Sequence, residues 1–206
     1  MTALITRVLT AGNSDPDGPP IHENNTWLIG DDAEVVVIDP AHDANAVLAV
    51  VGDRRVVAVL ITHGHWDHIR KAAELGHRVG VTPRMHPADA FLWREELGDE
   101  PFDELADGAV VEVAGTGLKA RHTPGHTPGS TSILAHDLGA VFTGDTLFPG
   151  GPGATRWDYS SFDTIIESLE GLFTLPDDTV VHPGHGDSTT IGTEAPHLEE
   201  WIERGW

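Results

Sequence analysis

The chain has 206 residues, of which 39% are hydrophobic and 22% charged, a balance typical of one soluble globular domain with a substantial core. Its formal net charge of −21 argues against a nucleic-acid partner, because phosphate contacts need clustered Lys and Arg. No apolar run approaches the roughly 20 residues that span a membrane, cysteine is absent, and the first residues lack the layout of a secretory signal. We therefore expect a single domain over residues 1–206, located in the cytoplasm, that acts on a small molecule and has no membrane or nucleic-acid partner. The oligomeric state is not readable from these features.

Apolar runs and turn residues alternate through the first half of the chain. Strands are predicted over residues 4–9, 26–29, 35–38, 56–61 and 78–81. Helices are predicted over residues 44–51, 69–75 and 88–97. A loop rich in Pro, Gly and Asp occupies residues 13–24.

The second half repeats this plan. Strands are predicted over residues 109–113, 118–122, 131–134, 140–143 and 179–182, and helices over 161–173 and 195–203. A loop rich in Gly and Pro covers residues 149–154, and we place it near a pocket because it follows Asp145 closely. The pattern alone indicates mixed α and β structure with two strand-rich halves.

The segment from Thr62 to His68 is the most informative part of the chain. It reads Thr-His-Gly-His-Trp-Asp-His and follows directly on the buried strand predicted over residues 56–61. A strand that ends in such a turn can hold imidazoles and a carboxylate around one point. This combination of ligands suits zinc, iron or manganese.

Three further motifs each present one potential ligand in a turn. His126 lies in Thr-Pro-Gly-His-Thr-Pro-Gly-Ser, Asp145 in Thr-Gly-Asp-Thr, and His185 in Pro-Gly-His-Gly. Glycine beside each ligand lets the backbone turn sharply and approach closely. Through these four motifs and their order, the chain from Asn25 to Leu198 resembles the metallo-β-lactamase superfamily, and within it the short, single-domain glyoxalase II-like hydrolases.

The resemblance implies a four-layer αββα sandwich with a metal site along one edge. It implies two divalent metal ions, with zinc favoured and iron or manganese as alternatives. A first ion would be bound by His63, His65 and His126 and a second by Asp67, His68 and His185, with Asp145 bridging the two.

The reaction implied by the resemblance is hydrolysis of a thioester, such as a hydroxyacyl-thiol, by a hydroxide that bridges the two metals. One metal polarises the carbonyl oxygen, and Asp67 is the catalytic residue expected to orient the nucleophile or accept its proton. A thiolate leaving group needs little protonation, which agrees with the lack of an obvious additional acid.

Several neighbours of the ligands carry weaker expectations. Asp39, at a strand end, is a candidate to hydrogen-bond a ligand imidazole, and Trp66 is expected in the pocket wall or in packing. His22 and His42 match no ligand motif and are expected to be ordinary. A lone phenol assists the carbonyl oxygen in some lactonases of the superfamily, but we discount this role for Tyr159 because it lies well past Asp145.

Differences between this sequence and the motifs of some superfamily members argue against several of their activities. Only residues 187–206 follow Gly186, so we do not expect the C-terminal helical region with which larger glyoxalase II enzymes hold glutathione. Asp145 stands where true β-lactamases usually have cysteine, and His65 stands where flavin-partnered diiron relatives have an acidic residue, so both activities are disfavoured. The open alternatives are a persulfide dioxygenase with one iron on His63, His126 and Asp145, and a lactone or ester hydrolase on the same metal pair.

Overall fold

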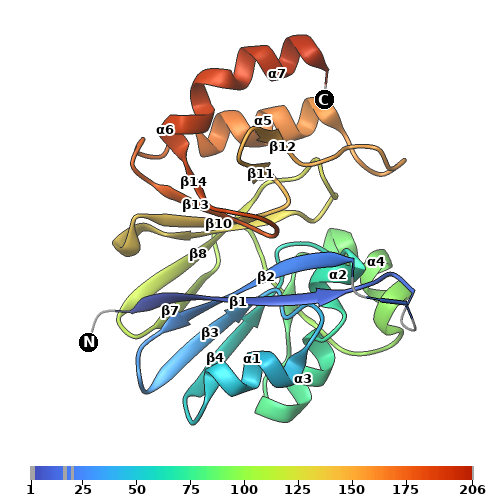
Figure 1. Ribbon diagram of the computed structural model, residues 1–206, viewed down its shortest axis with the longest axis vertical. Coiled ribbons are helices and arrows are strands. Elements are labelled where there is room, and N and C mark those ends of the chain that lie inside the picture. Colours follow the sequence, from blue (N-terminus) through green and yellow to red (C-terminus); the bar gives the residue numbers. More distant parts are fainter. Residues whose placement is uncertain (1–2, 16–17, 20, 206) are drawn as a thin grey trace.

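The computed structural model describes residues 3–15, 18–19 and 21–205. Two six-stranded sheets pack face to face, and helices cover the outer face of each sheet (Figure 1). The layers run helix, sheet, sheet, helix, as expected for an αββα sandwich.

The N-terminal sheet has the strand order β1-β2-β3-β4-β5-β6. Its first three strands pair antiparallel, and from β3 onward the pairing is parallel. The strands are β1 (Leu4–Gly12), β2 (His22–Gly30), β3 (Glu34–Ile38), β4 (Arg55–Leu60), β5 (Arg84–Met85) and β6 (Asp103–Glu104).

The C-terminal sheet has the order β14-β13-β10-β9-β8-β7, with β10 and β13 parallel and the other pairs antiparallel. A separate two-stranded ribbon joins β11 to β12. These strands are β7 (Val110–Val113), β8 (Thr116–His122), β9 (Thr131–Ala135), β10 (Ala140–Gly144), β11 (Leu147–Phe148), β12 (Gly151–Pro152), β13 (Val180–Pro183) and β14 (Thr189–Thr190).

Two of the longer helices begin at side chains that satisfy free backbone N–H groups. Asp43 accepts from two backbone amides at the start of α1, and Ser161 accepts from Thr164 N at the start of α5. The α-helices are α1 (Ala44–Val51), α2 (Trp66–Ile69), α3 (Ala72–Val79), α4 (Ala90–Leu97), α5 (Phe162–Leu172), α6 (Ile191–Glu194) and α7 (Leu198–Arg204). Short 3₁₀ turns cover Pro87–Asp89, His136–Leu138 and Ala195–His197. None of the helices in the described part of the chain is long and apolar enough to cross a bilayer.

Three apolar layers hold these elements together, because each sheet buries both of its faces. The central layer joins the two sheets and includes Ile29, Leu60 and Phe142. A second layer packs α1 and α3 on the N-terminal sheet, and a third packs α5 and α7 on the other sheet around Trp201.

Two of the sequence predictions were wrong. The strand predicted over residues 78–81 does not form, because α3 continues to Val79 and ends at Gly80, which adopts the left-handed conformation with φ of 72°. The helix predicted over residues 69–75 is divided between α2 and α3. The loop predicted over residues 13–24 is shorter, because β2 already begins at His22, and residues 16, 17 and 20 of that segment lie outside the described part.

Parallel pairing determines where the motifs meet. β3 and β4 end at the same edge of the first sheet, and β10 and β13 end at the same edge of the second. The four ligand motifs follow β4, β8, β10 and β13, so their turns converge where these two edges face one another.

Candidate metal centre

The turn after β4 is held tightly against α4. A Cβ atom on Gly64 would lie 2.8 Å from the Cβ of Leu92 and 3.0 Å from that of Asp89, so only glycine fits between His63 and His65. The chain then enters α2, which carries Asp67 and His68.

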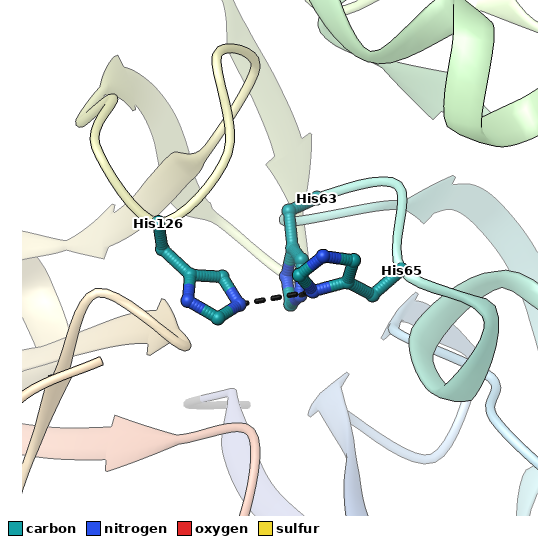
Figure 2. Close-up of side chains that lie close together, drawn as sticks. All are labelled: His63, His65 and His126. Atoms are coloured by element: carbon teal, nitrogen blue, oxygen red, sulfur yellow. Dashed lines mark hydrogen bonds between the residues drawn. The ribbon is translucent and has the colours of Figure 1, made fainter. Parts of the chain in front are cut away.

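Three histidines from two separate turns form a first donor triad (Figure 2). Nδ1 of His65 lies 3.1 Å from Nε2 of His63 and 3.0 Å from Nε2 of His126. Donor atoms of one tetrahedral ion with bonds of about 2.1 Å lie about 3.4 Å apart, so these three nitrogens have the spacing of ligands to a common metal.

Asp67, His68 and His185 form a second triad beside the first. Oδ2 of Asp67 lies 3.3 Å from Nε2 of His185 and 3.9 Å from Nε2 of His68. These separations again suit a single small cation with nitrogen and oxygen ligands.

Asp145 lies between the two triads. Its Oδ1 is 3.3 Å from Nε2 of His68, and its Oδ2 is 3.6 Å from Nε2 of His126. Oδ1 is buried and has no hydrogen-bond donor among the described residues. A buried carboxylate oxygen without a donor is costly, and a divalent cation at this position would remove the cost.

Two histidines of the triads are oriented by backbone carbonyl groups. Nδ1 of His126 donates to Ala154 O at 2.8 Å, and Nδ1 of His185 donates to Glu23 O at 2.7 Å. With one proton held on Nδ1, Nε2 is the nitrogen of each ring that can bind a metal in the cluster.

The other three ligand histidines are oriented by side chains. In each ring, the nitrogen that faces away from the cluster has a polar partner. These contacts join Nδ1 of His68 to Asp39 at 2.9 Å, Nδ1 of His63 to the hydroxyl of Thr62 at 3.1 Å, and Nε2 of His65 to the phenol of Tyr159 at 2.9 Å. Five inward-facing imidazole nitrogens beside two carboxylates are therefore preorganised for divalent metal.

The histidines of the two triads differ in the direction in which their pKa values are shifted. Burial lowers the pKa of His65 to about 3 and also lowers the pKa of His63 and His126, so the first triad is neutral. Burial opposes the charge on His68 and His185 as well, but nearby carboxylates, Asp145 foremost, outweigh it and raise the pKa of both, that of His185 to about 10. Metal binding at the second triad must therefore displace protons that the first triad does not hold.

Asp39 contacts the second triad as expected. Its carboxylate is buried and accepts hydrogen bonds from the backbone N and the hydroxyl of Thr62, and from Nδ1 of His68. The backbone of Asp39 has φ of 50°, an uncommon conformation for a residue with a side chain.

Asp89 supports the first triad in a similar way, although no motif in the sequence points to it. Its buried carboxylate accepts from Gly64 N at 2.8 Å, from the hydroxyl of Thr127 at 2.7 Å and from Gly129 N at 2.6 Å. It thereby ties the turn of His63 and His65 to the turn of His126.

Comparison with known proteins agrees with this geometry. A sequence model described as the metallo-beta-lactamase superfamily matches residues 20–185. The chain belongs to the metallo-β-lactamase superfamily. The predictions of the αββα fold and of a metal-dependent hydrolase are thus confirmed at the level of the superfamily.

Individual members of the superfamily match most of the chain. It is 32% identical over 192 residues to hydroxyacylglutathione hydrolase GloC of Haemophilus influenzae, a match that covers 84% of this chain and 90% of that relative. The crystal structure of TTHA1623 in a di-iron-bound form has a TM-score of 0.75 and 30% identity, covering 86% of this chain and 94% of that one. The structure of ETHE1 from Myxococcus xanthus has a TM-score of 0.76 and 30% identity, and the match covers 97% of this chain and 88% of that one.

The cluster of this metallo-β-lactamase superfamily member opens into a cavity of about 710 Å³. Aromatic side chains form much of its wall, and the guanidinium of Arg156 lies over the ring of Trp157 at the rim. The loop predicted to lie near the pocket does so, since Ala154 lines the cavity. The aromatic residues of the wall are Trp66, Phe148, Trp157 and Tyr159.

Tyr159 lies at the site despite its distance along the chain from Asp145, for which a role at the carbonyl oxygen was discounted. The loop after β12 returns and brings its Oη to 2.9 Å from Nε2 of His65. The ring lies nearly parallel to that of Trp157, with an angle of 6° between the planes. Burial raises the pKa of Tyr159 to about 12, which keeps the phenol protonated.

His22, His42 and Asn24 also lie at the site, where the sequence had suggested ordinary roles or none. His22 lines the cavity against Trp66, and Nε2 of His42 lies 2.7 Å from Oδ1 of Asn24. One signal does point to Asn24: β2 runs antiparallel to β3, so the start of β2 lies at the edge where β3 ends.

Proposed function

We propose that this member of the metallo-β-lactamase superfamily is a dinuclear metal hydrolase that cleaves thioesters of a small thiol. The arrangement of Asp145 between two donor triads is the observation that carries the proposal. One carboxylate within 3.3–3.6 Å of a histidine from each triad suits two cations that share a ligand, because a shared anion reduces their repulsion.

We further propose that both ions are divalent, with zinc favoured over iron or manganese. Imidazole and carboxylate ligands accept all three metals, so availability contributes to the choice. When bound, such ions lower the pKa of water toward about 7 and polarise a carbonyl oxygen.

The chain's own residues would orient the reaction. His68 and His185 outweigh the effect of burial and lower the pKa of Asp67, so its carboxylate is ionised at neutral pH. Asp67 also lines the cavity, where it can orient a nucleophile or take its proton. The phenol of Tyr159 accepts from Nε2–H of His65 and leaves its own O–H free to donate into the cavity.

The cavity suits a small, partly apolar acyl-thiol. Its volume is in the range of small-molecule sites, and its aromatic wall can cover an acyl chain or a thiol carrier. The acidic surface, with a net charge of −21, disfavours polyanionic partners such as nucleic acid.

Metal-loaded protein should be tested with a hydroxyacyl thioester of glutathione and with the oxygen ester of matched acyl chain, following thiol or acid release. We expect turnover of the thioester, and a loss of about 100-fold or more in kcat for Asp67→Asn. Asp137→Asn, in the surface 3₁₀ turn after β9, is the matched control and should behave as wild type.

Three outcomes would contradict the proposal. Protein with two metals that cleaves none of a panel of acyl-thiols is not a thioesterase, and preference for the oxygen ester or a lactone would indicate the ester hydrolase. Protein with one iron that consumes oxygen in the presence of glutathione persulfide would be the dioxygenase that binds through His63, His126 and Asp145.

A further inference from the structure

The side-chain amide of Asn24 points into the second donor triad. Its Nδ2 lies 3.2 Å from Oδ2 of Asp67, 3.4 Å from Nε2 of His68 and 3.3 Å from Nε2 of His185. Asn24 is fully buried at the start of β2. One amide atom is thus almost equally distant from all three donor atoms of the triad.

These distances are those of a further donor atom around the same ion, in addition to the shared Asp145. Four donors around a tetrahedral ion with bonds of about 2.1 Å lie about 3.4 Å from one another, and the amide atom satisfies this spacing to three donors at once. A group that merely hydrogen-bonded Asp67 would have no reason to be equidistant from the two histidine nitrogens.

An amide N–H that faces these histidine nitrogens would be unfavourable once a metal is bound. Nδ1 of His68 donates to Asp39 and Nδ1 of His185 donates to Glu23 O, so Nε2 is the nitrogen of each ring that would bind the metal. Once a cation is bound to these nitrogens, an N–H group at the position of the amide atom would face a positive charge. An amide oxygen at the same place would face it favourably.

His42 allows the amide to take either orientation. The oxygen and nitrogen of an asparagine amide exchange places by a half-turn of the group. Nε2 of His42 lies 2.7 Å from the outer amide atom. A neutral imidazole can accept from Nδ2–H of Asn24 at Nε2 while its proton sits on Nδ1. Nδ1 of His42 has no hydrogen-bond partner among the described residues, so the contact with Asn24 decides which nitrogen of the ring carries the proton.

We propose that Asn24 is a further ligand of the second metal ion through its amide oxygen, held in that orientation by Nε2 of His42. The inference rests on the metal centre of the proposed function. It concerns metal binding in the absence of substrate. The metal-binding measurements below therefore test it independently of whether the protein hydrolyses thioesters.

Substitution by aspartate and by leucine separates a ligand from a simple donor. Both variants keep nearly the size of asparagine, but Asn24→Asp offers an anionic oxygen and Asn24→Leu offers no polar atom. If residue 24 is a ligand, aspartate at this position should preserve metal affinity at the second site and leucine should weaken it. If residue 24 is only an N–H donor to Asp67, aspartate should weaken metal affinity most, because two carboxylates would then face each other.

Metal-free wild type and both variants should be titrated with Zn²⁺ against a competing chelator, and the second site followed separately with Co²⁺ by its absorption spectrum. We expect Asn24→Leu to weaken zinc affinity at the second site by about 10–100-fold. We expect the zinc affinity of Asn24→Asp to lie within about threefold of wild type or to be higher, and its Co²⁺ spectrum to be altered. Unchanged affinity of the first triad shows that the variants fold, and Asn45→Asp on the surface of α1 is the matched control. A loss of more than about threefold in Asn24→Asp, or no loss in Asn24→Leu, would overturn the proposal.

A second measurement uses the wild-type protein alone. ¹⁵N NMR of the zinc-loaded protein reports which nitrogen of His42 carries the proton. A proton on Nδ1 agrees with Nδ2–H of Asn24 donating to Nε2 and with its oxygen on the metal. A proton on Nε2 would mean that the oxygen faces His42, and would overturn the assignment.

Discussion

The carboxylate of Asp39 accepts a hydrogen bond from Nδ1 of His68 at 2.9 Å, and both side chains are buried. The bond directs Nε2 of His68 toward the carboxylates of Asp67 and Asp145. The left-handed backbone of Asp39 aims its carboxylate from the end of β3 across to the turn after β4.

Asp39→Asn should therefore weaken metal binding at the second triad. One oxygen becomes an NH₂ group that must face Thr62 or His68, both of which are donors at this position. We expect a loss of about 10–100-fold in affinity for the second zinc ion, measured by chelator competition, with a smaller effect on the first. Asp53→Asn, on the surface, is the control; equal affinity in Asp39→Asn and wild type would show that His68 needs no such partner.

Asp89→Asn should lower stability and disturb the first triad. Three donors converge on this buried carboxylate, so an amide in its place leaves at least one donor unpaired. We expect the free energy of unfolding to fall by about 2–3 kcal/mol in chemical denaturation, with weaker binding of the first metal. The exposed Asp99→Asn is the control, and a loss below about 1 kcal/mol would mean that the ligand turns hold each other without Asp89.

Tyr159→Phe should affect the first metal site while leaving the aromatic wall in place. The substitution removes the oxygen that accepts from Nε2–H of His65 but keeps the ring parallel to Trp157. We expect the first-site zinc affinity to fall about 10-fold, as for other groups that orient a ligand imidazole. Unaltered zinc affinity together with a higher KM would instead assign Tyr159 to substrate contact alone.

His182 should make stability depend on pH. Burial lowers its pKa to about 4, so between the ordinary value near 6.5 and about 4 the unfolded chain binds more protons than the folded one. The free energy of unfolding should consequently fall as the pH drops through this window. The side chain is partly exposed, so we expect a contribution of about 1–2 kcal/mol.

Denaturation of wild type and His182→Gln at about pH 7 and about pH 4.5 tests this, because the titration of the other histidines is common to both proteins and cancels in the comparison. Relative to wild type, His182→Gln should lose about 1–2 kcal/mol less stability between the two values. Parallel pH curves for the two proteins would contradict the prediction.

Much of the fold was predictable because its signals are local. Helix α1 has the predicted bounds, since Asp43 caps it and Gly52 ends it, and β3 and β4 follow runs rich in valine. The two-residue strands carry no pattern of their own; β5 (Arg84–Met85), for example, forms only because β4 lies beside it. Their pairing is a tertiary effect that local propensity does not record.

In the metal centre too, residues with a local sequence signal were predictable and residues brought in by tertiary packing were not. Residues within the four motifs were predictable, because each motif follows a predicted strand directly and contains a glycine. Asp89 and Tyr159 were not, because they come from other loops and contact the ligand turns only through the packing of α4 and the return of the chain after β12. Asn24 lies in a strand whose sequence does not distinguish a structural amide from a ligand.

The central claim is that two donor triads share Asp145 and hold two metal ions. Elemental analysis of the protein purified without added metal, with wild type and Asp145→Ala compared, tests this most directly. We expect about two divalent ions per wild-type chain and a marked loss of metal from the variant. One ion per wild-type chain that is not raised by dialysis against excess zinc would contradict it.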